Sequence, residues 1–262
     1  MIDPLTREAY RARWHRARER LILLNIQQEA FATGGVGQYV PQLAVRLVIL
    51  PGDPDSKRIE FNDEFWSWLE SEHENPLHGR VNIWGHTVIP TTSVAVVCQQ
   101  VSDGPWKWGS YLALYRHGGL DMGLGHGGGK SMGQKRLFRL VHIVGRLWSA
   151  LHFYGHAVSH FHIDGPWECS VALLQTQGGS LANFGAGWAQ YGEPYANPTP
   201  CPEPNLWLRR EFDEWPQPDD IRDLAFNIGG WIEDSWGMRC RRFLARNGPL
   251  AGQFDTSCYR SF

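Results

Sequence analysis

Residues 134–155, with the sequence QKRLFRLVHIVGRLWSALHFYG, carry an apolar side chain at every third or fourth position. The repeating positions are Leu137, Leu140, Val141, Val144, Leu147, Trp148 and Leu151. Apolar residues at this spacing form one stripe along an α-helix, and such a stripe is buried against a core. The stretch therefore predicts one long core helix, against which the other elements have to pack.

Short segments rich in Val, Leu and Ile lie on both sides of this helix and are typical of strands. They comprise residues 42–51, 80–88, 92–101 and 110–118 before the helix, and 168–177 after it. Residues 62–66 predict the start of a short helix. Residues 185–218 are rich in Pro, Gly and Tyr and predict a long loop, with a further strand around 206–209.

Two more helices are predicted near the ends of the sequence. The first begins at Asp3-Pro4, with a capping side chain followed by a proline, and stops near Gly34-Gly35. The second opens at Pro218-Asp219-Asp220, ends at Gly237, and has its apolar face at Ile221, Leu224, Ala225, Ile228 and Ile232. This order of elements predicts an α+β fold with a mixed or antiparallel sheet, a long core helix and a C-terminal helix.

The composition is that of a soluble globular protein, with 42% hydrophobic and 20% charged residues in 262. We expect one α+β domain over residues 1–262, or two subdomains that divide into 1–133 and 134–262. A net charge of −2 gives no bulk attraction to nucleic acid or to anionic membranes. Thirteen tryptophans predict a dense interior, with an aromatic-lined binding surface as the alternative.

Location and metal content are predicted from what the sequence lacks. No apolar run is long enough to span a bilayer, and the polar, Arg-rich start does not resemble a signal peptide, so we expect no membrane association. The five cysteines form no Cys-x-x-Cys pair, which favours a reduced, cytoplasmic protein without structural zinc and without a cofactor.

Residues 123–131, GLGHGGGKS, are the strongest candidate for a ligand site. Glycines before a Lys-Ser pair and a helix are typical of loops that bind phosphate through backbone N–H groups. The spacing departs from that motif, because Leu124 stands where the motif needs a glycine. A plain connecting loop is the alternative, and the candidate ligand-binding residues are Gly125, His126, Gly129, Lys130 and Ser131.

Three histidines, His152, His156 and His160, are spaced so that one helix face would align them. Imidazoles four residues apart can share a metal ion. Gly155 and the following Gly165-Pro166 indicate, however, that the helix ends within this stretch, which would break the alignment. We therefore predict no metal site, with hydrogen-bonded or interfacial histidines as the expected role.

An arginine-rich face on the first helix is the candidate docking surface. Its members lie mostly off the apolar stripe and are Arg11, Arg13, Arg16, Arg18 and Arg20. Arginines bind carboxylates and phosphates well, so this face could meet a protein partner first and nucleic acid second. A solvated face is the alternative.

The segments SYLALYRHGGLDMG, HIDGPWECSVALLQTQGGSLA and RWHRARERLILLN resemble the region that follows the DNA-binding domain in bacterial Schlafen AlbA_2-type proteins. The resemblance implies a strand-turn-strand, a long helix, a break at Gly-Pro and another strand. Too few residues precede the first strand to hold an AlbA_2 domain, so no nucleic-acid-binding residue is carried over. What the resemblance implies is an accessory domain for sensing or assembly.

These observations favour a non-enzymatic interaction or sensor module that works with a protein partner, in a bacterial defence-type or nucleic-acid-linked system. No Gly-x-Ser-x-Gly motif and no activated cysteine point to catalysis, and we assign no catalytic residue. One alternative is a protein or enzyme that binds a phosphorylated or nucleotide ligand through residues 123–131. Another is a structural subunit of a larger assembly, because aromatic residues are enriched at interfaces.

Overall fold

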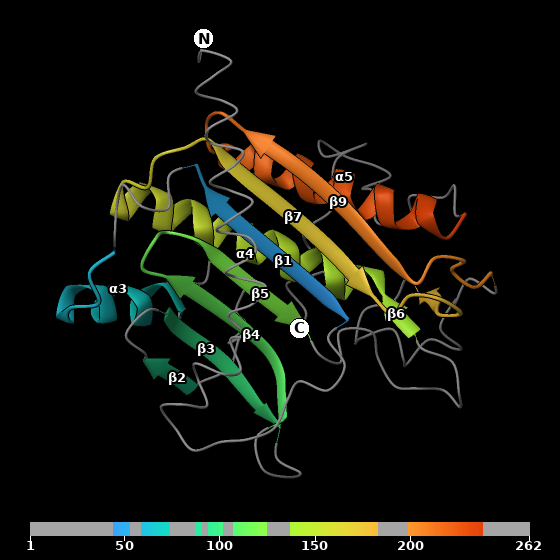
Figure 1. The fold of residues 1–262 in the computed structure, drawn as a ribbon, viewed down its shortest axis with the longest axis horizontal. Coiled ribbons are helices and arrows are strands. Elements are labelled where there is room, and N and C mark those ends of the chain that lie inside the picture. Colours follow the sequence, from blue (N-terminus) through green and yellow to red (C-terminus); the bar gives the residue numbers. More distant parts are fainter. Residues whose placement is uncertain are drawn as a thin grey trace, which may run out of the picture.

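A computed structural model describes residues 44–52, 59–73, 87–90, 94–101, 107–124, 137–182 and 199–237 (Figure 1). The elements in these residues are β1 (Val45–Pro51), α3 (Asp63–His73), β2 (Thr87–Pro90), β3 (Val94–Val101), β4 (Lys107–Tyr115), β5 (Leu120–Leu124), β6 (Leu137–Arg139), α4 (Leu140–Phe161), β7 (Trp167–Leu174), β8 (Ser180–Ala182), β9 (Asn205–Phe212) and α5 (Pro218–Ser235).

Seven of these strands form one sheet in the order β2-β3-β4-β5-β1-β7-β9, and every neighbouring pair is antiparallel. β1 lies inside the sheet, between β5 and β7, so its buried Val and Leu side chains have neighbours on both sides. β6 and β8 form a separate parallel pair. The α+β fold with a largely antiparallel sheet is confirmed.

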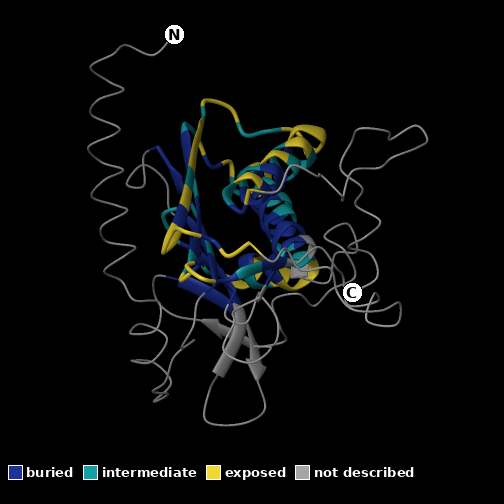
Figure 2. Ribbon diagram, turned by 90° about the vertical axis from the view of Figure 1, so that its right-hand side faces the viewer, coloured by how far each residue is buried: buried dark blue, intermediate teal, exposed yellow. Residues whose placement is uncertain are grey.

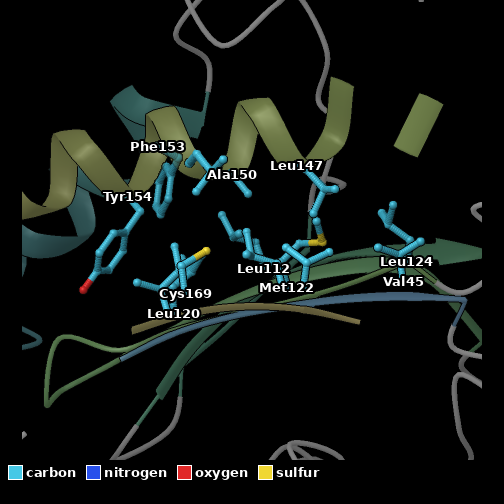
Figure 3. Packing of buried hydrophobic residues seen from close by; sticks show 14 of the residues in the cluster. Val45, Leu112, Leu120, Met122, Leu124, Leu147, Ala150, Phe153, Tyr154 and Cys169 are labelled. Carbon is cyan, nitrogen blue, oxygen red and sulfur yellow. The ribbon is translucent and has the colours of Figure 1, made fainter. Parts of the chain in front are cut away.

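The described helices α3, α4 and α5 lie on one side of the large sheet (Figure 2). α4 crosses this side and presents Leu147, Ala150 and Tyr154 to strand residues such as Leu120 and Met122 (Figure 3). The strands alternate, as a pleated sheet requires, so every second residue of β1, β5 and β7 joins this core. The core cluster holds residues from both sides of position 133.

The opposite face of the sheet contains a charged pair. Arg46 of β1 donates from Nε to Asp121 of β5 at 3.1 Å, and the Tyr111 hydroxyl of β4 donates to the same carboxylate at 3.2 Å. Burial by itself would lower the pKa of Arg46. The charge and hydrogen bonds of Asp121 raise this pKa by more, so the pKa of Arg46 lies above its ordinary value. Burial, together with Asp121, raises the pKa of Tyr111. This carboxylate therefore holds three strands together by charge-assisted hydrogen bonds.

The long helix differs from its prediction at both ends. It begins at Leu140 rather than at residue 134, because residues 137–139 form β6. It continues past Gly155 to Phe161 and ends at His162, a left-handed residue with φ of 49°. The prediction that Gly155 marks the helix end is wrong. A Cβ at Gly155 would lie 2.8 Å from Nε1 of Trp215, so this glycine lets Trp215 approach the helix.

Several other predicted elements are confirmed with shifted ends. The strand predicted at 110–118 runs from Lys107 to Tyr115, because Gly118 turns the chain into β5 with φ of 82°. The carboxamide of Asn62 accepts a hydrogen bond from the Phe65 amide at 3.0 Å and caps α3. The strand predicted around 206–209, within the long loop predicted over 185–218, is confirmed as the longer β9. α5 begins at Pro218 as predicted. The first helix lies outside the described residues.

Candidate functional site

Most of the predicted site residues lie outside the described residues. This holds for the ligand-binding candidates Gly125, His126, Gly129, Lys130 and Ser131 and for the docking candidates Arg11, Arg13, Arg16, Arg18 and Arg20. The first two residues of the glycine-rich stretch, Gly123 and Leu124, are described and belong to β5. Ligand binding by the glycine-rich segment and partner docking by the arginines of the first helix therefore stay predictions.

The three histidines share helix α4, so their alignment is not broken as predicted. His156 Nδ1 lies 2.8 Å from the carboxylate of Glu72 on α3. His160 stacks on Trp68 of α3 with ring centroids 5.4 Å apart, and His152 makes an edge contact with Trp148.

The contacts of His156 and His160 attach α3 to α4 through side chains. Within the part of the chain that the structure describes, no three His, Cys, Asp or Glu side chains are grouped to hold a metal ion. Sequence reasoning missed Glu72, because its contact with His156 joins two helices that lie far apart along the chain.

A basic group lies at the start of α4, directly after the glycine-rich segment. His142 and Arg146 are four residues apart, which places them on one side of the helix, and Arg139 is the N-cap residue that precedes it. Burial lowers the pKa of Arg146 to about 9. Burial, Arg146 and Arg139 together lower the pKa of His142 to about 3. Positive charge is thus crowded at a helix end whose backbone dipole is also positive.

The clearest exposed feature is the strand β9. Among the described strands β9 pairs with β7 alone, so it is an edge of the large sheet, and it is eight residues long against four for the opposite edge, β2. Trp207 lies in the middle of β9 and is 60% exposed. Among the described residues it is the large hydrophobic residue that is exposed. The tryptophans Trp68, Trp167 and Trp236 are buried, as the packing interpretation predicts.

The charges along β9 differ in how they are paired. Arg209 contacts the buried carboxylate of Glu168 on β7 at 2.7 Å and that of Glu211 at 3.2 Å. The adjacent Arg210 is also exposed, and its Nη1 donates a hydrogen bond to the backbone carbonyl of Arg209 at 3.3 Å. No carboxylate of a described residue pairs with Arg210.

An edge strand leaves a row of backbone N–H and C=O groups without partners in the sheet, which makes it a template for another strand. β9 combines such a row with an exposed aromatic side chain and an unpaired guanidinium group. The sequence predicted the strand but not its place at the edge. That place depends on which strands pair, and only the fold shows it.

Comparisons with known proteins identify no relative. No family model, no curated protein and no solved structure matches this chain. In the part of the chain that the structure describes, the helices are too short or too polar to cross a bilayer. The resemblance to the Schlafen-associated region stays a prediction.

Proposed function

We propose that this protein is an interaction module that binds a protein partner by strand addition at β9. The observation that carries the proposal is the edge position of an eight-residue strand with Trp207 60% exposed at its centre. Strand addition supplies affinity through main-chain hydrogen bonds and specificity through alternate side chains. An exposed tryptophan supplies a large apolar contact of the kind enriched at interfaces.

A further feature supports the interaction role, and another supports a cytoplasmic setting. Proteins protect exposed edges with charged side chains against unspecific pairing, and the Arg209-Arg210-Glu211 run does so here while leaving Trp207 accessible. Cys169 and Cys201 are free thiols, which supports the proposal that the module works in the reducing cytoplasm. A partner strand would extend the sheet beyond β9.

The experiment uses a photo-reactive amino acid at position 211, which is exposed on β9. In cells, we expect a discrete adduct whose cross-linked segment, mapped by mass spectrometry, is extended. Trp207→Lys should abolish the adduct, because an edge lysine opposes pairing. Asn227→Lys adds the same charge at an exposed position of α5 and should leave it intact. An adduct that responds equally to both substitutions would contradict strand addition at β9.

A second candidate function is favoured by the basic group on α4. We propose that Arg139, His142 and Arg146, with Lys130 of the preceding segment, bind a phosphorylated ligand. A bound anion would offset the positive charge of Arg146 and Arg139, which after burial contributes to the lowered pKa of His142. The test is thermal stabilisation by a nucleoside triphosphate or inorganic phosphate. Stabilisation that survives both Lys130→Ala and Arg146→Gln would contradict this role.

A further inference from the structure

We propose that the strand which pairs with β9 carries a carboxylate opposite Arg210 and an aromatic side chain opposite Trp207. This inference rests on the proposed function and names the chemistry of the partner. One face of β9 carries the unpaired charge of Arg210, and the other carries the exposed ring of Trp207.

The two residues lie on opposite faces of the strand. The side chains on one face of β9, those of Leu206, Leu208 and Phe212, pack toward the helix-covered core. Arg210 lies two positions from Leu208 and from Phe212, so it belongs to the same face. Trp207 and Arg209 belong to the other face. An incoming strand alternates in the same way, so one partner strand can meet both residues.

The unpaired charge calls for an acidic partner residue. Arg209 already contacts two carboxylates, those of Glu168 and Glu211, whereas Arg210 contacts none among the described residues. Opposite charges placed directly across two antiparallel strands stabilise the pair, and like charges destabilise it. A carboxylate across from Arg210 is therefore favoured, and a lysine there is disfavoured.

The exposed ring calls for a large apolar partner residue. On its paired side Trp207 lies opposite Ala172 of β7, a residue too small to cover an indole ring. Cross-strand pairs of aromatic side chains are favourable beyond the area that they bury. In an antiparallel partner the acidic residue comes first and the aromatic residue follows three positions later, with an apolar residue opposite Leu208 between them.

One extended strand fits this edge better than a second copy of the chain does. Figure 1 shows that α5 runs past β9 on the side away from β7. A copy paired through its own β9 would be related by a two-fold axis at this edge, and its own α5 would enter the same space. A single partner strand carries no second α5, so it can pair with β9 beside the α5 of this chain.

The probe is the synthetic peptide Ac-TTETVWTT-amide, in which Glu meets Arg210 and Trp meets Trp207 in antiparallel pairing. Its binding to the full chain is measured by calorimetry, and the bound position by hydrogen exchange of the β9 amides. The matched control is Ac-TTKTVWTT-amide. We expect the control to bind about fivefold more weakly, the upper end for an exposed ion pair. The variant Arg210→Glu should reverse this preference.

The outcomes separate the inference from the proposed function. If both peptides protect β9 amides with equal affinity, strand addition holds and the charge-matched partner is refuted. If Arg210→Glu keeps the preference of the wild type, the pairing with Arg210 is likewise refuted. If neither peptide protects β9, both proposals are contradicted. A dimer in sedimentation that Trp207→Lys abolishes would replace the peptide strand by a second copy.

Discussion

Substituting Gly155 with Ala tests how tightly Trp215 packs on α4. In a helix interior this change normally stabilises a protein by about 1 kcal/mol, because glycine loses more backbone freedom on folding. Here the new Cβ would lie 2.8 Å from Trp215 Nε1. The indole is held by Tyr154 and Trp167 at ring-centroid distances of 4.7 and 5.8 Å, so it cannot simply move away.

Overpacking of this kind typically costs about 1 to 3 kcal/mol. Offset by the gain in helix propensity, Gly155→Ala should lower the free energy of unfolding by about 1 kcal/mol in urea denaturation. The matched control is the same substitution in a Trp215→Leu background, where the clash is gone and alanine should stabilise. A stabilising effect of Gly155→Ala in the wild-type background would refute this packing.

Three further predictions concern buried ionisable groups. Asp121→Ala should lower the free energy of unfolding by about 3 kcal/mol in urea denaturation, because the guanidinium of Arg46 stays largely buried without its carboxylate. The double variant Arg46→Met with Asp121→Leu should recover most of this free energy. No recovery would argue against a penalty for the unpaired buried charge. The pKa of His142 is lowered to about 3 from 6.5, so the unfolded chain binds more protons between these values and stability should fall as the pH is lowered through them. The free energy of unfolding should change with pH by at most about 1.4 kcal/mol per pH unit. His142→Gln should remove this dependence. An unchanged dependence in that variant would show that other groups cause it. Burial, followed by the charge of Glu168, raises the pKa of Cys169 to about 12. Maleimide should therefore label this buried thiol only after unfolding. Rapid labelling of Cys169 in the native protein would contradict its burial.

Periodicity along the chain predicted the elements that bury one face. The apolar spacing from Leu140 to Leu151 identified the long helix, and the Pro218-Asp219-Asp220 start identified α5. These predictions succeeded because a helix or strand that packs on a core shows its buried side in the local sequence.

Contacts between distant segments escaped prediction. In the sequence Gly155 indicates a helix end, because its contact with Trp215 cannot be read from the helix itself. The pairing of Arg46 with Asp121 depends on β1 lying beside β5, and the contact of His156 with Glu72 depends on α3 lying against α4. The exposure of Trp207 likewise follows from strand order, so the candidate site at β9 could not be found from composition.

Hydrogen exchange of the individual β9 amides, measured by NMR on the free protein, tests the central claim most directly. In an edge strand alternate amides point toward the neighbouring strand and away from it. We therefore predict slow and fast exchange at alternating residues from Asn205 to Phe212, and uniformly slow exchange in β1, which is paired on both sides. Uniformly slow exchange along β9 would show that its outer side is already covered, and would contradict an edge open to a partner strand.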